Sequence, residues 1–267
     1  NATTSIAVPM ILINGAIDLH DDIIDQSKRK GNLLTVYGKF GKDIALLTGD
    51  ALLFKGFNLI YTAGAKIPDE KMVPILNTIN NTFFELGDGE ALEFQLRRRL
   101  NITPEEYFHV AKKKAANVKA HTRIGAILGG GTVREIDALS RFGTNLGILL
   151  IVQDDFFDMI EFSECRHRIR FEYAPLPLLY ALQNPVNKDK IEKVLKGKIK
   201  KGEWENFISH IYNAEDVKLL QKTVQELARN TFSQLDKLSS NVAPLKLLIS
   251  TILTTIKSIE SIATNKP

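Results

Sequence analysis

The 267-residue sequence predicts an all-α protein, a single bundle of roughly ten helices joined by short loops. Three observations predict this class. Apolar residues recur at spacings of three and four, as in Leu219, Leu220, Val224, Leu227 and Ala228. Helix start signals are frequent. Alternating patterns of the kind that form strands between hairpin turns are scarce.

The first predicted helix is the apolar stretch 6–17, which continues into the acidic sequence DLHDDIID. Pro9 and Asn14 interrupt this stretch. No run of about 18 or more uninterrupted apolar residues occurs, so we expect no transmembrane segment. The chain starts without Met or a charged leader, and we expect it to begin inside a domain.

The predicted starts of later helices carry clearer capping signals. Residues 103–106 (Thr-Pro-Glu-Glu) combine an N-cap, a proline at the first helical position and a capping-box acid. Residues 132–135 read the same way, directly after Gly129–Gly131, which can end the preceding helix. Residues 213–216 give a third start signal. Residues 161–177, which carry several arginines, are predicted to form a long connection.

Two copies of the pattern Asp-Asp-x-x-Asp stand far apart, each inside an apolar helical stretch. Residues four apart share one helix face, so two carboxylates of each motif project together. Burying them beside Ile, Leu and Phe without a counter-charge would be costly, whereas Mg²⁺ commonly bridges a few carboxylates to substrate phosphates. We therefore predict one set of catalytic metal ligands, namely Asp21, Asp22, Asp25, Asp154, Asp155 and Asp158.

Bulk properties narrow the function classes. The net charge is only +4 and the basic residues are spread out, so we expect no nucleic-acid partner. The single cysteine, Cys165, cannot form an internal disulfide. This fits a reducing compartment, and we expect a cytoplasmic protein.

With both motifs in view, the chain resembles the trans-polyprenyl diphosphate synthase family, which includes farnesyl and geranylgeranyl diphosphate synthases. The likeness covers nearly the whole chain, with HDDIID at 20–25, TVYGKFGKDIALLTGDALL at 35–53, GDGEALE at 87–93 and LPLLYAL at 176–182. It implies one domain over residues 1–267, an isoprenoid synthase-like helical bundle around a central cavity. The family's N-terminal helices, with their Gly-Lys-x-x-Arg segment, are missing from this sequence.

The resemblance also implies an activity. Mg²⁺ held by the two facing motifs would grip an allylic diphosphate, stabilise the departing diphosphate and leave an allylic cation for isopentenyl diphosphate to attack. Arg29, Lys30 and Lys114 match the family's diphosphate-binding cations, the first two after a one-residue shift. A homodimer, or a heteromer with another synthase subunit, is expected from the family.

Several family positions differ in this chain. The threonine that follows the family's lysine is Ala115, and a lysine before the Leu-Pro-Leu segment is matched by Tyr173. The metal ligands are thus retained while the cations for a second diphosphate are fewer. Three interpretations follow: a divergent active synthase, a weak or silent subunit of a heteromeric synthase, or a one-substrate enzyme resembling terpene synthases.

Product length has one determinant that can be read from the sequence. In the family the growing product extends beneath the first acidic motif, where short-chain synthases often carry an aromatic ring. Here that position is Ala16, beside Gly15, so we expect an open pocket lined by Ile13, Ala16 and Ile17 and a geranylgeranyl or longer product. The alternative is that Gly15 and Ala16 only allow tight helix packing. The exact chain length stays open.

Overall fold

The protein is described by a computed structural model that covers residues 2–185, 187–189, 193, 201–213 and 215–264. Over these residues the chain is helical apart from loops and one pair of two-residue strands, β1 (Arg29–Lys30) and β2 (Leu33–Leu34). The predicted all-α class is confirmed. Contacts group the chain into two compact units, one formed by residues 1–80 and 127–130 and the other by residues 81–126 and 131–267.

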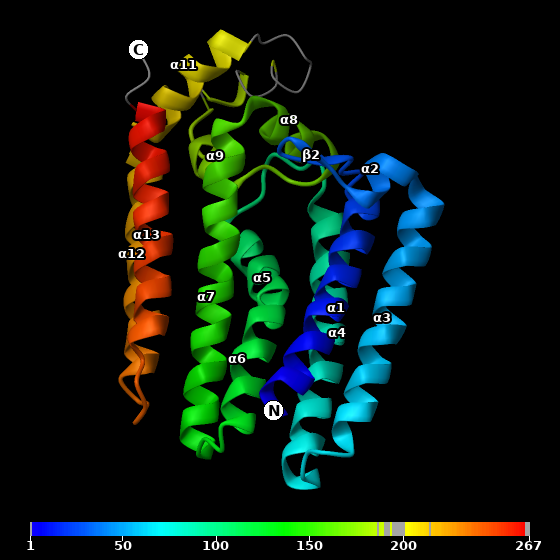
Figure 1. The fold of residues 1–267 in the computed structure, drawn as a ribbon. Helices are drawn as coiled ribbons and strands as arrows, with labels where there is room; N and C mark the ends of the chain where they lie inside the picture. The colour runs from blue at the N-terminus through cyan, green and yellow to red at the C-terminus, as the bar shows by residue number, and fades with distance from the viewer. Residues whose placement is uncertain (1, 186, 190–192, 194–200, 214, 265–267) are drawn as a thin grey trace. The chain divides into compact units, whose positions relative to one another are not determined.

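The first unit is built on two long helices, α1 (Ala2–Ile24) and α3 (Lys42–Gly64), which lie side by side (Figure 1). The short helix α2 (Val36–Phe40) precedes α3, and the start of α4 (Asp69–Leu96) completes the unit. Two glycines of α3 allow the close approach. A Cβ atom on Gly56 would lie 2.5 Å from Ile13 Cγ1, and one on Gly49 would lie 2.7 Å from His20 Nε2.

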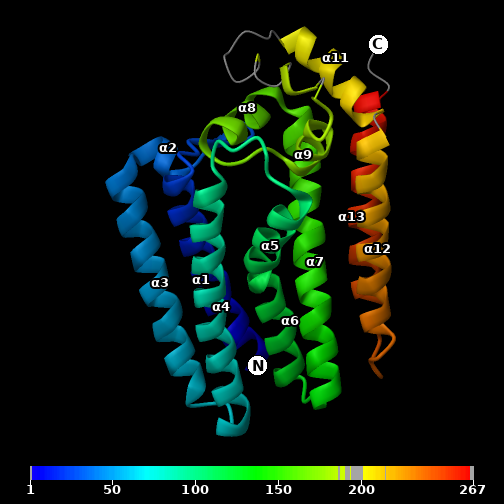
Figure 2. The ribbon, with the colours of Figure 1, turned by 180° about the vertical axis from the view of Figure 1, so that it is seen from behind.

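The second unit continues α4 and adds α5 (Pro104–Lys114), α6 (Ala116–Leu128), α7 (Val133–Ile160), α8 (Phe162–Phe171), α9 (Leu176–Leu182), α11 (Lys201–Tyr212), α12 (Glu215–Leu235) and α13 (Ala243–Thr264). Within it, α7 packs against α5, α12 and α13, and Figure 2 shows α12 and α13 side by side. Phe142, Leu149 and Phe156 of α7 are fully buried in the shared core.

Two of the three predicted helix start signals are confirmed at atomic detail. Thr103 and Thr132 both form complete capping boxes, with Glu106 and Glu135 as the acidic partners. The third signal is followed by α12, which begins at Glu215. Gly130, at a φ of 75°, follows the end of α6 in the left-handed conformation that glycine adopts without strain.

The prediction that residues 161–177 form a long connection was wrong for most of that segment, because α8 occupies residues 162–171. Cys165, Arg168 and Ile169 face the interior of the second unit, which is the spacing of one helix face. Two of these three inward positions carry a cysteine and an arginine rather than aliphatic side chains. The helical period was therefore hidden in the sequence.

Three helices, α1, α3 and α13, are long and apolar enough to cross a membrane by length and composition alone. The expectation of no transmembrane segment rested on the absence of long uninterrupted apolar runs. Helix length combined with mean hydropathy instead gives these three candidates. In α13, Ile249, Ile252, Ile256 and Ile259 recur every three or four positions and are buried in the core of the second unit. This is the pattern of an amphipathic helix packed within a protein.

Candidate active site

The first acidic motif lies at the C-terminal end of α1. The helix stops there because Gln26 adopts a left-handed φ of 57°, and the amide of Ser27 donates to the carbonyl of Asp22 at 2.8 Å. Asp21 and Asp22 lie in the last turn and Asp25 follows it, with Asp22 and Asp25 nearly buried. The carboxylates thus gather at the helix end where the backbone dipole is also negative, which favours binding of a cation.

The β1–β2 hairpin returns one positive charge to this motif. Gly31, at a φ of 57°, occupies the turn, and Lys30 Nζ lies 2.9 Å from Asp22 Oδ1. Burial lowers the pKa of Lys30, but its hydrogen bond and ion pair with Asp22 outweigh this and raise the pKa above the ordinary value. Arg29 lies next to it on β1, where its Nη2 donates to the carbonyl of Asn32 at 2.6 Å.

The contact of His20 with α3 gives a structural reason for the Gly-Asp pair in the segment 35–53, which resembles the family. His20 Nε2 lies 3.1 Å from Asp50 Oδ1, and Gly49 leaves the space that the imidazole ring fills. The Gly-Asp pair of GDALL therefore positions the histidine that precedes the first motif. This contact holds α1 against α3 immediately next to the acidic side chains.

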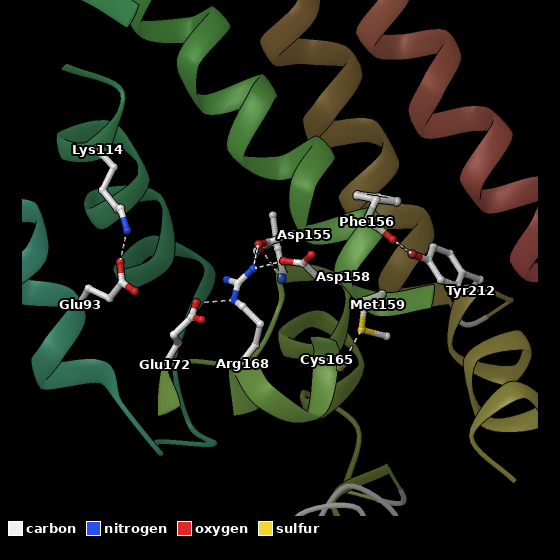
Figure 3. A network of polar contacts seen from close by, with 11 residues as sticks. Glu93, Lys114, Asp155, Phe156, Asp158, Met159, Cys165, Arg168, Glu172 and Tyr212 are labelled. Atoms are coloured by element: carbon white, nitrogen blue, oxygen red, sulfur yellow. Dashed lines mark hydrogen bonds and ion pairs between the residues drawn. The ribbon is translucent and has the colours of Figure 1, made fainter. Parts of the chain in front are cut away.

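The second acidic motif lies in the last turns of α7, and Figure 3 shows that Arg168 of α8 lies among its carboxylates. Arg168 Nη1 is 2.8 Å from Asp155 Oδ1 and 2.5 Å from Asp158 Oδ2, and its Nε is 2.7 Å from Glu172 Oε2. The other oxygen of Asp155 accepts the backbone N–H of Leu176 at 2.7 Å. Both oxygens of Asp155 are therefore engaged by the protein itself.

The pKa values of this cluster follow from burial and charge. Burial lowers the pKa of Arg168, yet the surrounding Asp155, Glu172 and Asp158 outweigh it and raise the pKa above its ordinary value. Burial raises the pKa of Asp158, and the guanidinium of Arg168 only partly opposes this. Asp154 reaches solvent. Nevertheless, desolvation by neighbouring atoms and the charges of Asp158 and Asp155 raise its pKa to about 6.

Lys114 lies at the end of α5 and contacts two carboxylates of α4. Its Nζ is 2.5 Å from Glu93 Oε2 and 3.2 Å from Glu90 Oε1 (Figure 3 shows the first contact). Glu93 is only 2% exposed, and carboxylate oxygens of Glu93 and Glu172 lie within 4.8 Å of one another. The charge of Lys114 is thus already shared by acidic partners of its own unit.

The predicted product-length residues lie along α1. Ile13 and Ala16 are buried and Ile17 is half-buried. A Cβ atom on Gly15 would meet only Leu52 Cδ1, at 3.9 Å, which is ordinary van der Waals contact. The α1–α3 packing requires glycine at Gly49 and Gly56, whereas a Cβ atom is tolerated at Gly15. Ala16 is fully buried, so an open pocket at this position stays a prediction.

The sequence-predicted residues fall into two groups. Asp21, Asp22, Asp25, Arg29 and Lys30 come together in the first unit, and Asp154, Asp155, Asp158 and Lys114 belong to the second. That the two motifs face each other across a cavity stays a prediction. Sequence reasoning considered Arg168 only as one of the arginines of residues 161–177 that could supply a cation for a diphosphate, and it did not single out Glu172 or Glu93. Arg168 and Glu172 are four residues apart, a spacing typical of an intrahelical ion pair, which is the signal that points to them.

A family model described as polyprenyl synthetase matches residues 2–214. The chain belongs to the polyprenyl synthetase family. The resemblance read from the two acidic motifs and the GDALL segment is therefore confirmed. The family match ends within the second unit, before α12 and α13.

Similar proteins of this family include two archaeal enzymes. The chain is 32% identical over 142 residues to a geranylgeranyl diphosphate synthase of Sulfolobus acidocaldarius, covering 53% of this chain and 43% of that protein. It is 33% identical over 161 residues to a short chain isoprenyl diphosphate synthase of Methanothermobacter thermautotrophicus, covering 60% and 48%. The matched part of the chain spans less than half the length of each.

The fold extends further than these sequence matches. The structure of geranylgeranyl pyrophosphate synthetase from Pyrococcus horikoshii superposes with a TM-score of 0.77 at 24% identity, covering 98% of this chain and 79% of that chain. A decaprenyl diphosphate synthase from Rhodobacter capsulatus gives 0.75 at 20% identity, covering 97% and 79%. Helices α12 and α13 thus belong to the shared fold.

Proposed function

We propose that the protein is a trans-prenyltransferase that condenses an allylic diphosphate with isopentenyl diphosphate, giving a geranylgeranyl or longer diphosphate. The observation that carries this proposal is the paired Asp-Asp-x-x-Asp motifs in a chain of the polyprenyl synthetase family. Relatives named geranylgeranyl diphosphate synthase and, from Natronomonas pharaonis, geranylfarnesyl diphosphate synthase support this product range.

Magnesium fits the donor set of the first motif. Three carboxylates of Asp21, Asp22 and Asp25 gather at the negative end of α1, with Lys30 supplying one positive charge to Asp22. When bound, Mg²⁺ would neutralise the diphosphate and stabilise the charge that develops on it as it leaves. We assign Asp21, Asp22 and Asp25 to holding this ion, and the solvent-reaching Asp154 to binding metal at the second motif. Asp155 and Asp158, also predicted as ligands, contact Arg168 instead.

Cationic and apolar side chains outside the acidic motifs would bind and shield the substrates. Arg29 and Lys30 are exposed on the hairpin that follows the first motif, and we assign their cationic groups to contacting a diphosphate oxygen. Lys114 would act in the same way after exchanging a carboxylate partner for a phosphate. Apolar side chains of α1, including Ile13 and Ala16, would exclude water from the allylic cation and accommodate the growing chain.

A second candidate is a catalytically weak subunit that works with a complete synthase. One observation favours it: Lys114, the family's diphosphate-binding lysine, lies between Glu90 and Glu93. A cation held by two carboxylates has less charge to offer a diphosphate. This candidate implies a heteromer, whereas an active chain is compatible with a homodimer. Either would act in the cytoplasm, as the single cysteine suggests.

Both candidates are separated by one assay. The protein is incubated with Mg²⁺, isopentenyl diphosphate and farnesyl diphosphate, alone and mixed with a complete short-chain synthase, and the prenyl products are resolved by length. A longer product from the chain alone supports the first candidate. A new product only in the mixture, with co-elution of both proteins, supports the second. No change in either arm contradicts both.

A further inference from the structure

Arg168 is held inside the second acidic motif on every side that the described structure defines. Its guanidinium bridges Asp155 and Asp158 of α7 and pairs with Glu172 (Figure 3). It also lies 5.4 Å from the ring centre of Tyr173. The residue is 9% exposed. A long cationic side chain buried in this way is a built arrangement, because its cost is offset only by well-placed acidic partners.

This arrangement conflicts with a metal ion on the same oxygens. A cation bound between Asp155 and Asp158 would lie where Nη1 lies, 2.8 Å and 2.5 Å from the two carboxylates. The metal ion and the guanidinium would then be in direct contact, and two positive charges so close together repel strongly in a partly desolvated site. The second oxygen of Asp155 accepts the N–H of Leu176 at 2.7 Å, which leaves it less available to a metal ion.

We propose that Arg168 is the resident cation of the second acidic motif and keeps divalent metal ions off Asp155 and Asp158, leaving Asp154 as its metal ligand. Arg168 is then a positioning residue, which fixes how many metal ions the protein accepts. The proposal extends the metal site of the proposed function. It concerns metal binding without turnover, so a chain that makes no prenyl product could still confirm it.

The placement of Arg168 follows from α8. This helix replaces the predicted connection after α7, and its inward face brings residue 168 back to the end of α7. Glu172, one turn later, orients the guanidinium through Nε and leaves Nη1 for the two aspartates. The neighbouring Arg170 is exposed and lies over the Phe171 ring, so the same short helix supplies a matched control.

Mn²⁺ is the probe, because its bound and free forms are counted by electron paramagnetic resonance. In the substrate-free protein, Asp158→Asn is expected to leave Mn²⁺ stoichiometry and affinity within about threefold of wild type, since Arg168 already occupies that carboxylate. Asp21→Asn is the positive control and is expected to lose bound Mn²⁺. Loss of a bound ion in Asp158→Asn overturns the proposal.

The converse experiment removes the arginine. Arg168→Gln is expected to gain one Mn²⁺ ion per chain, or to bind Mn²⁺ about tenfold more tightly, and Arg168→Gln combined with Asp158→Asn should abolish the gain. Arg170→Gln should behave as wild type. A folded Arg168→Gln protein without any gain overturns the proposal. Should this variant not fold, the comparison of wild type with Asp158→Asn decides alone.

Discussion

At the scale of single residues, the same acidic pattern is placed in two different electrostatic settings. In the first motif Lys30 contacts Asp22, from an exposed hairpin. In the second, Arg168 is buried among Asp155 and Asp158. A surface lysine is easily displaced by a metal or a phosphate, whereas a buried bridging arginine is not. We therefore expect the two copies of the same sequence motif to bind metal ions differently.

Asp21→Asn removes one negative charge from the first motif while keeping the side-chain shape. We expect prenyl product formation to fall by about 100-fold or more, because metal stabilisation of the leaving group contributes several kcal/mol. Product formation at saturating substrates is the measurement. Asp18→Asn, an exposed residue of the same helix, should retain activity, and equal losses in both variants would contradict the assignment.

Asp154 gives a pH dependence with a definite sign. Its pKa is raised to about 6 in the folded protein, above the ordinary value of about 3.9. The folded state therefore holds a proton that the unfolded state has released, and stability without metal falls as pH rises from about 4 through 6. Metal-dependent activity should instead rise across pH 6, as the carboxylate ionises.

This prediction is checked by thermal unfolding without metal at pH 5 and pH 8, for wild type and Asp154→Asn. The variant should be the more stable protein at pH 8 and should show a smaller difference between the two pH values. A variant that is less stable than wild type at pH 8 would contradict a raised pKa at this carboxylate.

Ala16→Phe places an aromatic ring on α1 at a buried position five residues before Asp21. We expect shorter prenyl products, because the ring would block the path that the growing chain requires. Gly15→Ala is the control, since its added Cβ atom fits with Leu52 at 3.9 Å. Unchanged product length in a folded Ala16→Phe protein would remove this part of the proposal.

At the scale of elements, short-range signals located the helix boundaries and long-range packing determined the helix faces. The capping boxes at Thr103 and Thr132 could be read from four residues each, since a cap is satisfied within one turn. Helix α8 could not be read in this way. Its inward face includes an arginine whose carboxylate partners Asp155 and Asp158 lie on another helix.

The contact between α6 and α7 gives a prediction at this scale. A Cβ atom on Gly143 would lie 2.8 Å from the backbone Cα of Lys119 and would also collide with the side chain of Thr122. Gly143→Ala should therefore lower the free energy of unfolding by about 1–3 kcal/mol. Gly125→Ala, on the exposed side of α6 with nothing within 4 Å, should raise it by about 0.5–1 kcal/mol.

Chemical denaturation of the two variants beside wild type measures both effects. Because alanine favours the helical conformation over glycine in each case, the opposite signs isolate the steric term. A stabilised Gly143→Ala protein would show that α6 and α7 do not approach as closely as the structure has them.

At the scale of the whole molecule, the sequence matches and the fold differ in extent. The two archaeal relatives match about half of the chain or somewhat more, whereas the solved structures superpose on almost all of it. Helices α12 and α13 are amphipathic and pack on α7, a role that many sequences with the same periodicity fulfil. Both helices lie beyond the residues that the family model matches, yet within the shared fold.

Metal binding should be visible as a change in global stability. Mg²⁺ that binds only the folded protein stabilises it by mass action, by about 2.7 kcal/mol at a concentration 100 times the Kd. We expect the melting temperature to rise with Mg²⁺ and to return to its starting value with EDTA. In Asp21→Asn the rise should be much smaller, while K⁺ at the same ionic strength should have no such effect. An equal rise in wild type and Asp21→Asn would place the stabilising ion elsewhere.

The sequence by itself determined the helical class, the family, the capped helix starts and the two acidic motifs, because each of these depends on residues close together in the chain or on a recurring pattern. Only the tertiary structure decided which charges meet. It placed Lys30 against Asp22, Lys114 between Glu90 and Glu93, and Arg168 among the second set of aspartates. Electrostatic partners are chosen by distance in space. Each of these pairs joins two elements that follow one another in the chain, and how such elements pack is not specified by their local sequence.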